Sequence, residues 1–183
     1  MWTGENTHKR NLQTALAVCR TELVAFIEDD DWYHPEYLER SLNKTKEGYG
    51  LVGEANARYY HLPTCSYRMM KNRGHASLSQ SLMHRSMLPC LLDILATNED
   101  SFDILLWQAS WKTGKPFLFP TSTHVVGVKG MPGRPGVGLG HRPGSNWSKD
   151  TGCDTLQQWI GPDAQLYTEY LAGALLQRLR GIL

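Results

Sequence analysis

The chain has 183 residues, of which 41% are hydrophobic, and its formal net charge is +1 at neutral pH. This size and composition suit one compact hydrophobic core, and the near-zero charge gives no general attraction to nucleic acid or to a charged membrane. The four cysteines form no CxxC pair, which argues against a structural zinc site or a redox motif. No stretch approaches the roughly 20 apolar residues that a membrane span needs, and the N-terminus lacks an apolar signal core, so we expect a cytoplasmic protein.

The first predicted elements are a helix over residues 11–18, which has apolar residues at helical spacing, and a strand over residues 23–27. The strand reads LVAFI, and a wholly apolar run of this length is typical of a buried strand in a parallel sheet. It ends at the acidic run Glu-Asp-Asp-Asp, residues 28–31, and Pro35 then opens a second helix. Four acidic residues therefore lie where a strand gives way to a helix.

Two neighbouring strands are predicted next, over residues 51–61 and 66–70, and two helices follow, over residues 86–96 and 98–114. The rest of the chain is predicted as a strand over residues 117–128, a glycine- and proline-rich loop over residues 130–144 and a final amphipathic helix over residues 164–182. Asn98 is a natural N-cap for the second of these helices, and Pro120 suggests an edge or a bulge in the strand that contains it. We expect one core over residues 1–150 and a C-terminal helical extension, residues 151–183, packed on it.

Consecutive carboxylates repel one another, and their burial is costly unless a cation or hydrogen-bond donors compensate. Hard oxygen ligands suit Mg²⁺ or Mn²⁺, and such an ion can neutralise the diphosphate of a nucleotide that becomes a leaving group. The alternative interpretation of residues 28–31 is a solvated acidic turn.

The segment FIEDDDWYHPEYLE, residues 26–39, closely resembles the metal-binding segment of family-2 glycosyltransferases, whose fold is called GT-A. In that family an apolar strand ends in a DxD-type motif, which a proline-started helix follows. Arg10-Asn11 resembles the family's Arg-Asn helix, and NEDSFDIL, residues 98–105, resembles its Glu-Asp motif at a helix start. The segment HRPGS, residues 141–145, is similar to an Arg-x-His-Pro-Gly-Ser segment of the family, although its basic residues stand in a different order.

The resemblance implies an α/β fold, a GT-A-like mixed sheet flanked by helices, and a metal-dependent inverting transfer of a sugar from a nucleotide-diphosphate sugar to an acceptor hydroxyl. By motif position it assigns the catalytic base to Asp100. The ligands of Mn²⁺ or Mg²⁺ are assigned to Asp30, Asp31 and His141. The donor-binding residues are assigned to Glu28, Arg10, Asn11 and Arg142. Glu28 departs from the aspartate that is usual there. An acid in the first turn of a helix is stabilised as an anion, so Asp100 also suits a purely structural cap, and His124 competes with His141 as a ligand.

Family members normally begin with a strand-helix-strand portion that contacts the nucleobase, and the resemblance covers mainly residues 8–146. We therefore expect an N-terminally truncated or compact form of the GT-A fold. A fragment, a natural compact variant and a second subunit that restores the missing surface all remain open. A strand edge left unpaired would favour a homo-oligomer.

Two other functions fit the same residues. A metal-dependent nuclease or phosphohydrolase could use the same acids around one or two ions, and a noncatalytic binding module could descend from the same fold. Basic and aromatic residues gather over residues 59–86, a mixture that suits a phosphate-bearing acceptor or nucleic acid, with a solvated basic face as the alternative. The acceptor, whether glycan, small molecule or nucleic acid, therefore stays open.

Overall fold

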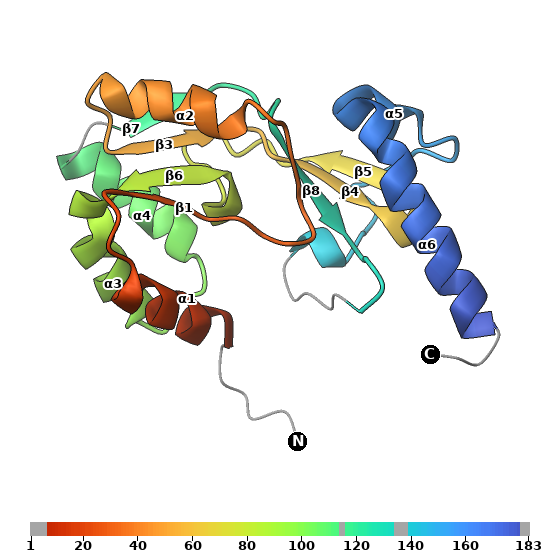
Figure 1. Ribbon diagram of the computed structural model, residues 1–183, viewed down its shortest axis with the longest axis horizontal. Helices are drawn as coiled ribbons and strands as arrows, with labels where there is room; N and C mark the ends of the chain where they lie inside the picture. Colours follow the sequence, from red (N-terminus) through yellow and green to blue (C-terminus); the bar gives the residue numbers. More distant parts are fainter. Residues whose placement is uncertain (1–6, 114–115, 134–138, 180–183) are drawn as a thin grey trace.

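The computed structural model of the protein describes residues 7–113, 116–133 and 139–179. Over these residues the chain forms two mixed sheets flanked by helices, which is the predicted α/β class (Figure 1). In the same ranges, every helix is too short or too polar to cross a membrane.

The first sheet has four strands in the order β1-β6-β3-β7, namely Leu23–Ala25, Ser81–His84, Leu51–Glu54 and Pro116–Phe119. Only the β3–β7 pair is parallel. Helix α2 (Tyr37–Lys46) covers one face of this sheet (Figure 1). The other face is covered by helices α1 (Thr7–Val18), α3 (Leu88–Leu95) and α4 (Phe102–Thr113). Because successive strand residues point to opposite faces, Leu51 packs with Trp107 in the core on the α4 side, whereas Val52 packs with Leu42 of α2.

The second sheet has five strands in the order β2-β8-β4-β5-β9, namely Trp32–Tyr33, Val125–Lys129, Arg58–His61, Ser66–Met69 and Ser148–Lys149. Helices α5 and α6, Asp154–Ile160 and Ala164–Leu179, pack on it. Tyr60, Val126 and Val128 form the core there with Leu156 and Ile160. The boundary proposed at residue 150 therefore falls just before the helices that complete this second core.

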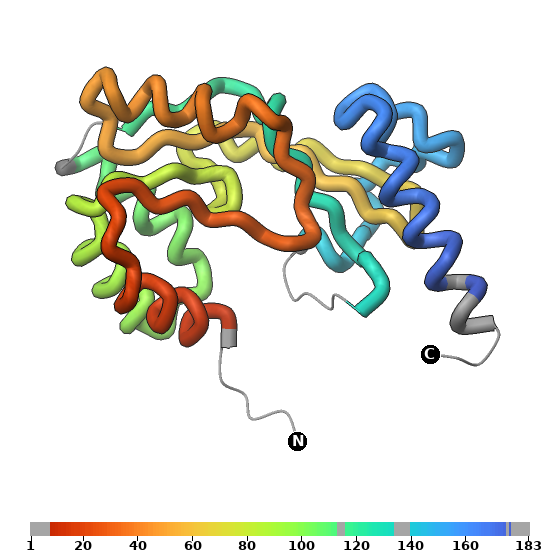
Figure 2. The backbone as a smooth tube through the Cα atoms, in the orientation of Figure 1, coloured from red at the N-terminus to blue at the C-terminus, as the bar shows by residue number. Residues whose placement is uncertain are grey.

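Three links carry the chain from the first sheet to the second: β1 to β2, β3 to β4, and β7 to β8. Figure 2 shows the first of them running from β1 toward the second sheet before the chain returns to α2. The acidic run, residues 28–31, lies on this link. The site is thus held between the two sheets.

The structure corrects several predicted elements. Strand β1 is antiparallel to β6 and half-buried, so the prediction of a buried parallel strand was wrong; the unpredicted strand β6 folds back beside it. The predicted strands over residues 51–61 and 117–128 each split in two, at Asn56, whose φ is +51°, and at Pro120, which has no N–H for a ladder. The helix predicted from residue 98 begins at Phe102, so Asn98 is not its N-cap. The helices predicted over residues 11–18, 86–96 and 164–182 are confirmed as α1, α3 and, as far as Leu179, α6.

Candidate functional site

Three of the predicted site residues converge on the link from β1 to β2. One carboxylate oxygen from each of Glu28, Asp30 and Asp31 lies within 4.8 Å of the other two. The side chain of Asp31 is 1% exposed, that of Asp30 11% and that of Glu28 42%, so the cluster runs from the interior to the surface. The hydroxyl oxygen of Tyr33 accepts a hydrogen bond from the backbone N–H of Glu28 at 3.0 Å, and pairing of β2 with β8 fixes the end of the link.

A lysine occupies the centre of this acidic cluster. The Nζ atom of Lys129, at the end of β8, lies 2.6 Å from Asp31 Oδ1, 3.0 Å from Glu28 Oε2 and 3.6 Å from Asp30 Oδ1, and its side chain is 5% exposed. The sequence patterns assigned Lys129 no role. The sequence did contain a signal for such a role, because Lys129 is the single charged residue at the end of an otherwise apolar strand, VVGVK. A lysine buried with such a strand needs acidic partners for its ammonium.

The electrostatics of the cluster follow from burial and charge. Burial raises the pKa of Asp31 to about 7, with Glu28 and Asp30 acting in the same direction and Lys129 opposing them. Burial alone would lower the pKa of Lys129, but Asp31, Glu28 and Asp30 outweigh it and raise that pKa above its usual value. Lys129 therefore stays protonated at neutral pH. With all three carboxylates ionised, one ammonium leaves two negative charges uncompensated, which favours a further cation or a proton.

Aromatic and basic side chains border the cluster. Burial raises the pKa of Tyr59 to about 12, and Lys129 Nζ lies 5.8 Å from the centre of its ring. Burial and then Asp31 raise the pKa of Tyr167, on α6, also to about 12. Burial and the charge of Lys129 lower the pKa of His141, while Asp30 and Glu28 oppose them. His141 is thus near enough to interact electrostatically with the cluster, and α6 contributes to its surroundings.

The predicted catalytic base lies outside the helix on which its assignment was argued. Asp100 is exposed and precedes α4, so the stabilisation expected from a first helical turn does not apply to it. The acid in the first turn is Asp103, which is half-buried and whose Oδ1 accepts a hydrogen bond from the N–H of Ile104 at 2.8 Å. Asp103 also contributes to the raised pKa of Tyr59, so its charge acts on the ring that borders the cluster.

The remaining predicted donor-binding residues lie on two separate elements. Arg10 and Asn11 are exposed on α1, and Arg142 is exposed directly after the short 3-10 helix Leu139–His141. Residues 114–115, at the end of the helix predicted over residues 98–114, and part of the glycine-rich loop, residues 134–138, fall outside the described residues.

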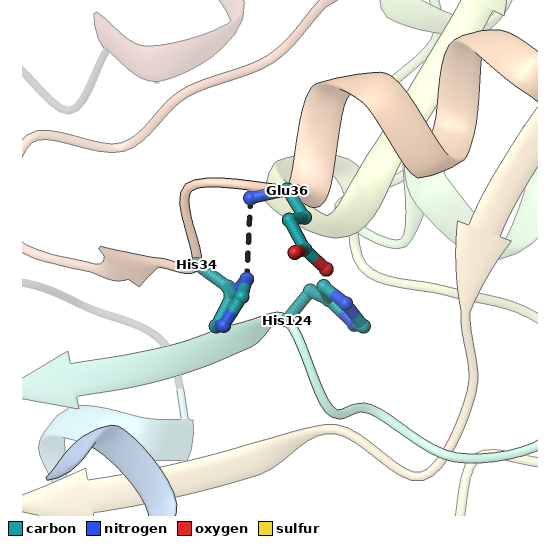
Figure 3. Close-up of side chains that lie close together, drawn as sticks. All are labelled: His34, Glu36 and His124. Carbon is teal, nitrogen blue, oxygen red and sulfur yellow. Dashed lines mark hydrogen bonds between the residues drawn. The ribbon is translucent and has the colours of Figure 1, made fainter.

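A second group of potential ligands contains His34, Glu36 and His124, and Figure 3 shows the three side chains facing one another at the start of α2. Nδ1 of His34 accepts a hydrogen bond from the backbone N–H of Glu36 at 3.2 Å. The Nη1 atom of Arg40 lies 2.5 Å from Nδ1 of His124. Nδ1 of His124 also lies 3.2 Å from Oε1 of Glu54, and the guanidinium of Arg40 places a positive charge beside His124. These contacts favour a hydrogen-bonded brace over a second cation site.

The fold and the acidic cluster together define a compact GT-A-like protein, in which an acidic segment joins a strand of one sheet to a strand of the next. The family model for glycosyl transferase family 2 matches residues 2–96, just over half of the sequence and including the whole acidic segment. The chain belongs to glycosyl transferase family 2. The matched range ends before Asp100, Asp103, Lys129 and His141.

The comparison with solved structures gives a distant likeness. The crystal structure of A197 from STIV is 13% identical, matches 62% of this chain and 62% of that chain, and has a TM-score of 0.39. No curated protein matches the sequence.

Proposed function

We propose that this chain transfers a sugar from a nucleotide-sugar donor to an acceptor hydroxyl, with the acidic cluster as the place where the donor's diphosphate binds. The convergence of Glu28, Asp30 and Asp31 within the family-matched segment carries the proposal. A solvated acidic turn, the alternative, does not account for a side chain as buried as that of Asp31.

The carboxylates fit a divalent ion. Mg²⁺ and Mn²⁺ prefer oxygen ligands, and three carboxylate oxygens within 4.8 Å of one another supply them. Asp30 and Asp31 would hold the ion, with Glu28 and His141 at the border of the site. When bound, the ion would neutralise charge on the departing nucleoside diphosphate. These carboxylate ligands suit Mn²⁺ and Mg²⁺ equally.

An apolar cavity gives the rest of the donor a place to bind. About 290 Å³ in volume, it lies between α1 and β1, is lined by Leu12, Leu16, Val24 and Phe26, and reaches Glu28. A flat nucleobase suits such a surface, and Glu28 at its edge would then contact the ribose. Ala15 also lines the cavity, so Ala15→Trp should fill it and weaken nucleotide binding while leaving the acidic cluster intact.

In the proposed reaction a carboxylate takes the proton of the acceptor hydroxyl as its oxygen attacks the anomeric carbon. The bond from that carbon to the phosphate oxygen breaks, and its electron pair leaves with the nucleoside diphosphate, which inverts the configuration. The family resemblance assigns the base to Asp100. The half-buried position of Asp103 in the first turn of α4 makes it the second candidate.

Isothermal titration calorimetry with nucleotide sugars that carry uracil, guanine or thymine tests the proposal. Binding should strengthen with Mn²⁺ and should be lost in Asp30→Asn. Asp93→Asn, which changes an exposed acid on α3, is the matched control and should bind as the unaltered chain does. Equal binding by the two variants would exclude the acidic cluster as the donor site. Phosphodiester cleavage in the absence of any sugar donor would favour a nuclease instead.

A further inference from the structure

The acidic cluster already contains a cation that belongs to the chain itself. Lys129 Nζ lies within hydrogen-bond distance of oxygens from Asp31 and Glu28, and 3.6 Å from an oxygen of Asp30. These are the same three side chains whose oxygens converge closely enough to hold a metal ion. The ammonium and a divalent ion would therefore use the same lone pairs.

The two cations cannot share these oxygens at full strength. A divalent ion of this kind binds carboxylate oxygens at about 2.1 Å, which would bring it close to an ammonium hydrogen-bonded to the same atoms. Like charges so close together repel strongly in a site with little water. The ammonium therefore has to move away when the metal binds.

The stem of Lys129 is packed in place, so this movement has a structural requirement. A Cβ atom added to Gly140 would lie 3.0 Å from Lys129 Cγ and 3.2 Å from the ring of Tyr59. The backbone of the 3-10 helix Leu139–His141 thus lies against both side chains. The ammonium can leave the carboxylates only if its stem rotates beneath this helix or the helix shifts with it.

We propose that Lys129 is a tethered counter-cation that competes with the divalent ion for Glu28, Asp30 and Asp31. In the resting protein the ammonium neutralises part of the cluster and keeps its affinity for metal low. A donor diphosphate reverses the balance, because its oxygens offer the displaced ammonium a new anionic partner while the metal takes the carboxylates. Metal and diphosphate therefore bind with positive coupling. This inference rests on the proposed function and deepens it, since it states what controls metal entry at the same site.

Electron paramagnetic resonance of free Mn²⁺ tests the competition on the protein alone, without nucleotide. Lys129→Met should bind Mn²⁺ at least about tenfold more tightly than the unaltered chain, because removing a nearby positive charge removes a repulsion of that order. Lys46→Met, which alters an exposed lysine at the end of α2, is the matched control and should leave the affinity unchanged. Equal or weaker Mn²⁺ binding by Lys129→Met, or no binding by either protein, would overturn the inference.

A second measurement needs no variant and covers the case in which Lys129→Met does not fold. Nuclear magnetic resonance of the lysine ammonium groups, assigned through the bonds from the backbone, should show a slowly exchanging Lys129 signal in the metal-free protein. Saturating Mg²⁺ should abolish that slow exchange. An unchanged Lys129 signal, at Mg²⁺ concentrations that shift the carboxyl carbons of Asp30 and Asp31, would show that the two cations coexist and would refute competition. Neither readout uses a donor, so a failure of donor binding would count against the proposed function and the coupling to diphosphate, while the competition between Lys129 and the metal would stand.

Discussion

Lys129 Nζ lies 2.6 Å from Asp31 Oδ1, and both side chains are almost completely buried. The two residues are 98 positions apart in the sequence and meet because β2 pairs with β8. A buried ion pair adds little net stability, but removal of one partner leaves the other charge without compensation. The pair therefore joins the two halves of the site and makes it sensitive to charge.

Lys129→Met should lower the free energy of unfolding by about 3 kcal/mol at pH 9, and the loss should shrink as the pH falls toward 7. The reason is the pKa of Asp31, which burial already raises to about 7 in the unaltered protein and which loss of the ammonium would raise further. Above pH 7 the unaltered protein gains stability from an ionised Asp31 beside the ammonium, whereas the variant has to keep the carboxyl protonated, so the difference between the two grows with pH. Urea unfolding at several pH values measures this. A loss that does not depend on pH would contradict the assignment of Asp31 as the affected partner.

Asn substitutions distinguish the two candidate bases. If Asp103 is the base, Asp103→Asn should lower kcat about 100-fold or more, whereas Asp100→Asn should leave it within a few-fold. The reverse ranking would support the assignment by resemblance. Rates of donor consumption with each variant, measured under saturating nucleotide sugar, decide between them. If both variants keep their activity, neither Asp100 nor Asp103 is the catalytic base.

Glu54 should be essential to the link between β7 and β8. Its carboxylate is 1% exposed and accepts hydrogen bonds from the hydroxyl of Ser122 and the backbone N–H groups of Thr123 and His124, while Arg40 pairs with it at 3.1 Å. Glu54→Gln removes the charge and should cost about 2–4 kcal/mol of unfolding free energy.

Urea unfolding of Glu54→Gln beside Glu47→Gln checks that expectation. Glu47 is exposed at the end of α2, so its substitution should change stability by less than about 0.5 kcal/mol. Similar small effects in the two variants would show that the hydrogen bonds of Glu54 are replaceable.

Gly127 should tolerate no side chain, because its neighbour on β4 is the ring of Tyr59. A Cβ atom at Gly127 would lie 2.3 Å from that ring, so Gly127→Ala should displace Tyr59 from the Lys129 region and destabilise the protein by about 1–3 kcal/mol. Gly74→Ala, where the added atom meets nothing within 4 Å, is the control. Thermal unfolding of both variants measures the difference, and an unchanged Tm for Gly127→Ala would disprove the close packing.

Much of the site could be predicted from sequence because its first half is continuous in the chain. Residues 23–39 contain strand β1, the acidic run, Pro35 and the start of helix α2 in one stretch, and the family match covers them. Apolar periodicity likewise predicted α1 and α6, since burial of a helix face repeats with the helical turn. The position of Asp100 outside helix α4 could not be predicted from such local patterns. The acidic residues before and after Ser101 resemble helix-start signals equally well, and only the structure places the start of α4 at Phe102, whose side chain is buried.

The sequence by itself determined the acidic turn, the class of fold and the family, because these depend on residue types at short spacing. The tertiary structure alone decided that the segments over residues 51–61 and 117–128 divide between two sheets, that β1 runs antiparallel to β6, and that Lys129 enters the acidic cluster. Local patterns record which residues are buried and which conformation they favour. They do not record which distant strand supplies the partner, and strand pairing is what brings the ammonium of β8 to the carboxylates that precede β2.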